Sequence, residues 1–264
     1  KIQKEIILMI INELCMNNIN FKSIVVLLCF GLSSLLTSLM PFKVHLNVNF
    51  GYCFVGNETI NEESFLKRFP VDERGELMSC AYQLRINPDE RLPVIDNAET
   101  ARKIAVVLLC ANFLPKVDCK DLKAELIDEN IWKVYPRKNR QQASPVIYIQ
   151  REDAKILRIV AKEGINQRCS FSPEGRWLYY PDSTVKRKEP LVDTPELAYK
   201  IGSTIIASSY GQEELRQKPF VVSSINGKVW LVHGNTNAGT GIGNVGYIYL
   251  CKKNGMVLGM YHTK

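Results

Sequence analysis

The motif Asp193-Thr194-Pro195-Glu196 begins the stretch that decides the fold, which runs from Leu191 to Lys264. A polar cap followed by a proline and a glutamate is typical of a helix start, and Tyr210-Gly211 is typical of a helix end. Asn226-Gly227 and Asn254-Gly255 predict hairpin turns. Runs rich in β-branched and aromatic residues predict four strands, which are Phe220–Ile225, Val229–His233, Gly246–Cys251 and Val257–His262. One helix packed on a short antiparallel sheet is therefore expected.

The same order of elements occurs earlier in the chain. Asp96-Asn97-Ala98-Glu99 aligns with the later helix start at an offset of 97 residues, and Trp132 aligns with Trp230. Further on, Ile147-Tyr148-Ile149 aligns with Ile248-Tyr249-Leu250, so the offset grows to 101. Because the matches keep their order while the offset grows, insertions are expected only in loops, and the sequence predicts a tandem repeat. The repeats are residues 94–163 and residues 191–264.

Repeat one has its own helix and strand signals. Its helix is predicted to begin at Asp96, with Glu99 completing a capping box. Ala101, Ile104 and Leu108 give this helix an apolar stripe together with Ala105. The strands expected from short alternating runs are Leu122–Ile127, Ile131–Tyr135, Val146–Gln150 and Ile156–Val160.

Two segments lie outside the repeats. Residues 41–93 form an N-terminal segment in which Val44–Phe54 and Ser79–Ile86 are predicted strands and Glu58–Phe69 is a predicted short helix. Residues 164–190 link the repeats. The linker is rich in aromatic residues around Pro173-Glu174-Gly175, which predicts a hairpin packed on one of the repeats.

An uncharged apolar stretch of 17 residues, Ile24 to Met40, follows Lys22. A cation followed by an apolar run is typical of a secretory signal peptide or an N-terminal membrane anchor, and a buried helix is the alternative. Residues 1–40 are interpreted as this targeting segment, with residues 1–15 expected to lie upstream of a start at Met16. Export to the periplasm or envelope is predicted, with contact to the membrane only through residues 22–40.

Charge and cysteine content narrow the function classes. The 264 residues carry a net charge of +7, but the basic residues are scattered, whereas nucleic-acid binding requires a basic face or helix. No nucleic-acid partner is expected. No Cys-x-x-Cys motif is present, which argues against zinc and thioredoxin-type redox chemistry. Disulfides are permitted by an even number of cysteines after Met40, although Cys110 and Cys251 are expected to be buried free thiols.

No catalytic, metal or cofactor site is predicted. Gly241-x-Gly243-x-x-Gly246 has the spacing of a dinucleotide fingerprint, but a strand rather than a helix follows the glycines, so no helix N-terminus would hold a phosphate. His233 and His262 do not make a metal site without further ligands. Helix capping explains the recurring acidic pairs of the two helix starts.

Repeat two resembles the small bacterial immunity proteins of polymorphic toxin systems that have a nuclear transport factor 2-like fold. The resemblance lies in the ordered set Glu196-Leu197-Ala198-Tyr199-Lys200-Ile201, Tyr210-Gly211, Lys218-Pro219-Phe220, Val229-Trp230-Leu231-Val232-His233-Gly234, Tyr247-Ile248-Tyr249-Leu250, Asn254-Gly255-Met256-Val257-Leu258 and His262-Thr263-Lys264. Repeat one resembles it less well, because it lacks the Tyr-Gly, the Lys-Pro-Phe, the glycines and the terminal histidine. The pattern is also similar to PepSY-type inhibitory propeptide domains.

The resemblance implies an α+β fold of two tandem cystatin-like, nuclear transport factor 2-like units, each a helix packed on a curved antiparallel sheet of about four strands. It also implies a non-catalytic protein that binds and neutralises a cognate protein toxin. Two alternatives are an enzyme or small-ligand carrier with a cone-shaped pocket, of the isomerase or dehydratase type, and a structural envelope protein. The candidate partner-binding residues are aromatic residues, histidines and glycines of repeat two: Trp230, His233, Gly239, Gly241, Gly243, Tyr247, Tyr249 and His262.

Overall fold

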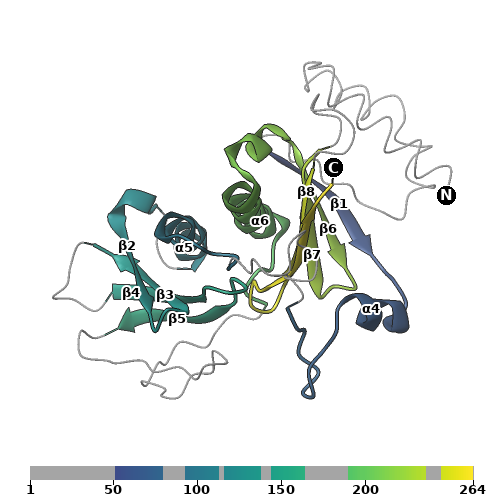
Figure 1. Ribbon diagram of the computed structural model, residues 1–264, viewed down its shortest axis with the longest axis horizontal. Coiled ribbons are helices and arrows are strands. Elements are labelled where there is room, and N and C mark those ends of the chain that lie inside the picture. The colour runs from purple at the N-terminus through teal and green to yellow at the C-terminus, as the bar shows by residue number, and fades with distance from the viewer. Residues whose placement is uncertain are drawn as a thin grey trace, which may run out of the picture.

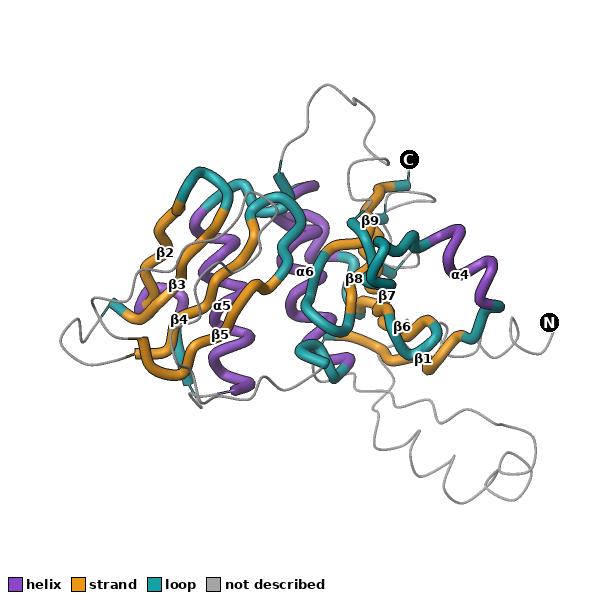
Figure 2. The backbone as a smooth tube through the Cα atoms, turned by 90° about the horizontal axis from the view of Figure 1, so that it is seen from below, coloured by secondary structure: helices purple, strands orange, loops and turns teal. Residues whose placement is uncertain are grey.

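Two sheets flank a central pair of helices in the computed structural model (Figure 1). The structure describes residues 51–79, 93–112, 116–137, 144–163, 190–235 and 245–263. Figure 2 shows the layers from another side: the four-stranded sheet, helix α5, helix α6 and the five-stranded sheet follow one another. The predicted α+β class, with helices packed on antiparallel sheets, is confirmed.

Repeat two, which we call unit 2, is built around α6 (Pro195–Tyr210), followed by the short 3₁₀ helix η3 (Gln212–Arg216). Its antiparallel strands are β6 (Phe220–Ile225), β7 (Val229–His233), β8 (Gly246–Cys251) and β9 (Val257–His262). All four strand predictions are confirmed. Ala198, Ile201 and Ile205 on α6 are buried against the sheet, as their helical spacing predicts. Gly202 lets α6 approach closely, because a Cβ there would lie 3.0 Å from the Cβ of Val232.

Repeat one, which we call unit 1, has the same order of elements, with a helix followed by four strands. It contains α5 (Ala98–Asn112), the 3₁₀ helix η2 (Cys119–Asp121) and the strands β2 (Leu122–Ile127), β3 (Ile131–Pro136), β4 (Ser144–Gln150) and β5 (Ile156–Glu163). The apolar stripe of α5 is fully buried, as predicted, whereas Cys110 on the same helix is exposed, contrary to the prediction. Cys110 lies outside the stripe, so its side chain faces away from the sheet.

The helix starts differ from the predictions by one residue. In α5 the side chain of Asn97, not Asp96, accepts a hydrogen bond from the Thr100 N–H at 2.9 Å. Asp96 instead pairs with Arg151 at 3.0 Å. In α6 the N-cap is Thr194, whose hydroxyl accepts from the Leu197 N–H. Asp, Asn and Thr are all good caps, so composition alone does not decide which one adopts the extended backbone that capping requires.

Unit 1 and unit 2 each make the same contacts at matching positions. The indole N–H of Trp132 donates to the Ile95 carbonyl at 3.0 Å, and that of Trp230 donates to the Val192 carbonyl at 2.7 Å. The β4–β5 and β8–β9 pairs carry a register shift at matching positions, directly after Tyr148 and Tyr249. Both units therefore have the same local contacts at these positions.

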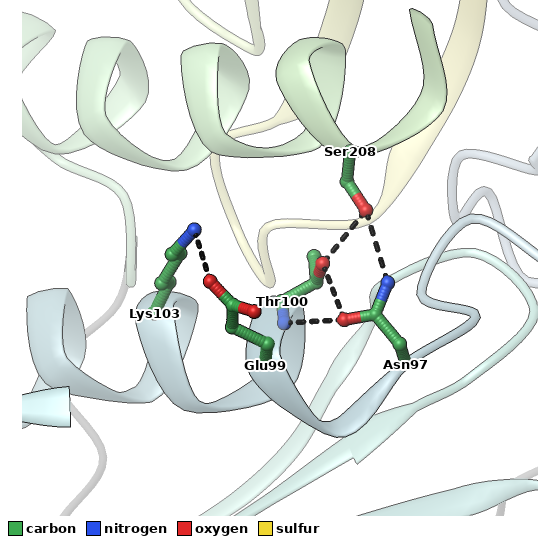
Figure 3. Close-up of polar contacts among 5 residues, drawn as sticks. All are labelled: Asn97, Glu99, Thr100, Lys103 and Ser208. Carbon is green, nitrogen blue, oxygen red and sulfur yellow. Dashed lines mark hydrogen bonds and ion pairs between the residues drawn. The ribbon is translucent and has the colours of Figure 1, made fainter. Parts of the chain in front are cut away.

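The units meet through their helices and through two turns. The start of α5 lies beside the end of α6, where the hydroxyls of Thr100 and Ser208 are 2.7 Å apart and Asn97 also reaches Ser208 (Figure 3). The helices therefore run antiparallel. Two reciprocal backbone bonds join the turns: the Ile156 N–H donates to the Asn254 carbonyl at 2.9 Å, and the Val257 N–H donates to the Asp153 carbonyl at 2.7 Å. Ile156 matches Val257, and Asp153 matches Asn254, so the two turns make equivalent hydrogen bonds to each other.

The N-terminal segment belongs physically to unit 2. Strand β1 (Tyr52–Glu58) pairs in parallel with β6, at the edge of the five-stranded sheet. Helix α4 (Glu62–Arg68) covers part of the sheet face that points away from α6, where Phe65 and Phe69 join a core with Val229 and Tyr249. The predicted strand Val44–Phe54 is described only from its last residues, and helix α4 begins later than the predicted Glu58.

Several sequence predictions fall on other parts of the chain. The apolar stretch 24–40, most of the strand predicted at Ser79–Ile86 and nearly all of the linker 164–190 lie outside the described residues. No helix among those that are described is both long and apolar enough to cross a membrane. Cys119 and Cys251 carry free thiols, as Cys110 does, and Cys251 is buried as predicted.

Candidate partner-binding surface

Five of the eight candidate residues lie in described strands of unit 2, and they divide between the two faces of its sheet. His233, Tyr247 and Tyr249 point away from α6, whereas Trp230 and His262 point towards it, because neighbouring residues in a strand alternate between faces. Gly239, Gly241 and Gly243 lie outside the described residues. The structure therefore brings three of the eight together on one surface.

A row of aromatic rings crosses the outer face of the sheet. His233 on β7, Tyr247 on β8 and Tyr261 on β9 are cross-strand partners. Their ring centroids are 4.7 Å apart at each step, and the planes differ by 17° and then by 4°. We call these three residues the aromatic ladder. All three are half-buried, so part of each residue is accessible to a partner.

Arg68 and Tyr249 form the rim of the ladder on the side of α4. The guanidinium of exposed Arg68 lies 4.7 Å from the centre of the Tyr249 ring and donates a hydrogen bond to the Tyr249 hydroxyl. Tyr249 is 5% exposed and packs edge-on against Phe69. Tyr249 therefore joins α4 to the ladder and offers little surface of its own.

Burial sets the protonation of the ladder. It raises the pKa of the Tyr247 hydroxyl, and burial together with neighbouring Tyr249 raises the pKa of Tyr261. Burial also lowers the pKa of His233, against the opposing effect of a hydrogen bond between Nδ1 and the Gly234 carbonyl. At neutral pH both tyrosines keep their protons and His233 is uncharged, so the ladder is a neutral surface. The Tyr261 hydroxyl shares a hydrogen bond with Tyr249, whereas burial alone is the largest cause at Tyr247.

Trp230 lies in the core rather than on either surface. It is 3% exposed, its ring packs edge-on against Phe54 of β1, and Lys252 Nζ lies 3.7 Å from the ring centre. Together with the bond to Val192, these contacts enclose the indole. The Trp230 side chain holds the sheet to the loop before α6, and too little of it is exposed to contact a partner.

A second polar group lies on the helix side of the sheet. His262 Nε2 is 3.1 Å from Glu214 Oε1, and the Gln217 amide donates to Glu214 Oε2 at 2.8 Å. The Glu214 side chain is 7% exposed and that of His262 is 21% exposed, with the Tyr210 ring 4.9 Å from the imidazole. A buried carboxylate beside a histidine can move a proton, and it also fastens η3 to β9.

The outer face of unit 1 has no such ladder. At the positions that match His233, Tyr247 and Tyr261, unit 1 carries Tyr135, Val146 and Val160. Val146 and Val160 are buried, and the Tyr135 hydroxyl donates to Glu125 at 2.7 Å. The stacked aromatic surface is a property of unit 2.

The described part of the chain contains no group of three or more His, Cys, Asp or Glu residues that could hold a metal. The glycines of the dinucleotide-like motif that precede Gly246 lie outside the described residues, while Gly246 begins strand β8, so a strand follows the motif, as predicted.

Sequence reasoning missed three residues of these two groups. Tyr261 could have been found, because it occupies the position of β9 opposite Tyr247 once the hairpin register is known. Arg68 and Glu214 could not, since α4 is far from the ladder in sequence and η3 carries no periodic signal.

The comparisons with known proteins address the same unit. Residues 197–264, which run from α6 to the end of β9, match the model of a family described as NTF2 fold immunity protein. No curated protein and no solved structure matches the chain. The resemblance stated from the sequence is thereby confirmed: the C-terminal unit of this chain is similar to NTF2 fold immunity proteins.

Proposed function

We propose that this protein is an immunity protein, which binds a cognate protein toxin through unit 2 and neutralises it without catalysis. The observation that carries the proposal is the match of residues 197–264 to the immunity protein family. The half-buried aromatic surface on that unit supports it, since tyrosines are enriched at protein interfaces.

Protection of toxin-producing cells tests the proposal. The full chain and the polypeptide products of adjacent reading frames would be produced together and singly, and survival compared. Survival restored by the chain, together with a stoichiometric complex in native mass spectrometry, is the expected result. If cells die at the same rate with and without the chain, and no adjacent product binds it, the protein is not an immunity protein for them.

A small-ligand carrier or an acid–base enzyme is the second candidate. The observation in its favour is the Glu214–His262 pair, because a carboxylate that is 7% exposed beside an imidazole is suited to proton transfer. Its anchoring contacts to Gln217 and Tyr210 favour the structural role instead. A small molecule that copurifies with the chain and is lost in Glu214→Gln would reverse this order.

We also propose that the protein is exported, with residues 22–40 as a signal peptide or membrane anchor. The uncharged stretch after Lys22 supports this. Its toxin would then act outside the cytoplasm. Fractionation of cells that produce the tagged chain tests the proposal, and recovery of the chain in the cytoplasmic fraction alone would contradict it.

A further inference from the structure

We propose that the aromatic ladder, His233, Tyr247 and Tyr261, with Arg68 at its rim, is the surface that contacts the toxin, and that the toxin presents carboxylates there. This inference rests on the proposed function and adds to it the binding surface and the chemistry of the partner.

The stacking of the ladder decides which part of each ring a partner can reach. With centroids 4.7 Å apart and planes nearly parallel, the Tyr247 ring has a stacked neighbour over each face, and His233 and Tyr261 each have one over the face that points to Tyr247. A planar ligand such as a nucleobase therefore cannot insert between them. For Tyr247 this stacking leaves the ring edge, which carries partial positive charge, and the hydroxyl to contact a partner. Electron-rich groups, such as carboxylates and carbonyls, fit this surface.

The Tyr247 hydroxyl is the donor that the ladder offers to a partner at neutral pH, because the Tyr261 hydroxyl already shares a hydrogen bond with Tyr249. Because burial raises the pKa of Tyr247 and Tyr261, neither ionises under physiological conditions, and neither repels an anion. His233 lies at the other end of the row and is uncharged, with Nδ1 bonded to the Gly234 carbonyl. The surface thus combines apolar rings with polar tips, which is the composition of interface anchors.

Arg68 adds a cation at the rim of the aromatic ladder, next to Tyr249. Its guanidinium is exposed and is held against the Tyr249 ring, so its position is fixed in advance of binding. A pre-positioned guanidinium binds carboxylates with less loss of side-chain entropy than a mobile lysine does. The whole chain carries a net charge of +7, which attracts an acidic protein over a longer range.

The comparison with unit 1 assigns the contact to unit 2. The matching positions on unit 1 carry two buried valines and a tyrosine whose hydroxyl is already bonded to Glu125. The region that matches the immunity family includes all three ladder residues. The family-like unit therefore carries the surface that its neighbour lacks.

The experiment measures binding of the full chain to its toxin, identified as the adjacent reading-frame product that it neutralises. Tyr247→Ala and Tyr261→Ala are expected to weaken the Kd by about 30-fold or more, as for central interface anchors. Arg68→Glu is expected to weaken it by about tenfold, mainly through slower association, and to reduce its dependence on salt concentration. Circular dichroism and urea unfolding confirm that each variant folds.

Two control variants separate this surface from general effects. Tyr135→Ala removes the matching ring of unit 1, and Arg216→Glu makes the same change of net charge on η3, where Arg216 pairs with exposed Glu213. Both are expected to bind within about twofold of the unmodified chain. If a tyrosine variant is unfolded, Tyr247→Phe and Tyr261→Phe keep the ring stack and test the hydroxyls alone.

The outcomes distinguish the inference from the function on which it rests. If the unmodified chain neutralises and binds the toxin, but the ladder and Arg68 variants bind it as tightly, the surface is wrong and the function stands. Loss of binding in Tyr135→Ala alone would move the contact to unit 1. If the unmodified chain binds no adjacent product, the function fails, and the inference fails with it.

Discussion

Unit 1 and unit 2 have the same contacts on the inner side of their sheets, which faces the helix, and different side chains on the outer side. Each fixes a tryptophan N–H to a carbonyl just before its helix, and each has its register shift at the same place. On the outer side, unit 1 has buried valines where unit 2 has half-buried aromatic rings. The contacts that define the fold are therefore the same in both units, while the outer face is free to differ for recognition.

The largest expected effect tests the shared tryptophan anchor. Trp230→Ala is expected to lower the free energy of unfolding by about 3–5 kcal/mol, because it leaves a cavity in the core. Trp132→Ala is expected to cost less, since Trp230 also contacts Phe54 and Lys252. Urea unfolding of the full chain measures both. An unchanged midpoint for Trp132→Ala would break the structural equivalence of the two units.

Exchange of the residue types at two matching turn positions, Asp153 and Asn254, is expected to have the next largest effect on stability. Asp153 is 7% exposed, and burial, as the largest cause, raises its pKa from 3.8 to about 6. The matching turn of unit 2 has Asn254, whose side-chain oxygen accepts from the Met256 N–H as that of Asp153 does from the Lys155 N–H. A raised folded pKa means that the ionised carboxylate is disfavoured by folding, so stability falls as the pH rises from about 4 to about 6.

Asp153→Asn is therefore expected to stabilise the chain by about 1–3 kcal/mol at pH 7.5 and to have little effect at pH 4. Asn254→Asp is expected to destabilise it at pH 7.5. Thermal unfolding of both variants at the two pH values measures the exchange. A gain for Asp153→Asn that is equal at pH 4 and pH 7.5 would show that ionisation is not its cause.

A smaller effect is expected at the contact between the helices. Thr100 and Ser208 share a hydrogen bond of 2.7 Å, whereas the positions that match them in the other unit are Leu197 and Ala111. A double-mutant cycle with Thr100→Val and Ser208→Ala is expected to give a coupling energy of about 1 kcal/mol. A coupling of zero would mean that helix packing alone joins the units at this point.

The smallest effect is expected for a feature that both units share on their surfaces. Glu99–Lys103 in α5 and Glu196–Lys200 in α6 are ion pairs one helical turn apart, at 2.7 Å and 2.6 Å. All four side chains are exposed, so solvent screens both pairs. Glu99→Gln and Glu196→Gln are expected to leave the unfolding midpoint unchanged within error at physiological salt. A clear loss in only one of the two would reveal a further contact of that carboxylate.

The sequence predicts the strands of unit 2 completely, because their β-branched residues and Asn-Gly turns are local signals. The partner of β1 could not be predicted, since it pairs in parallel with β6 across the whole of unit 1, and no short-range pattern encodes such a pairing. For the same reason the contact of α4 with the outer face of unit 2 could not be predicted. The aromatic residues of the ladder were visible as strand residues, but only the register shows which of them stack.

The pairing of β1 with β6 also has a consequence for synthesis on the ribosome. Strand β1 emerges early, but its partner emerges only after all of unit 1 has been made. Unit 1 has all of its own strands by Glu163 and can collapse first, since domains generally fold as their sequence becomes available. The tyrosine surface is therefore expected to form last, and a chain that stops short of β9 would lack Tyr261 and with it the end of the ladder.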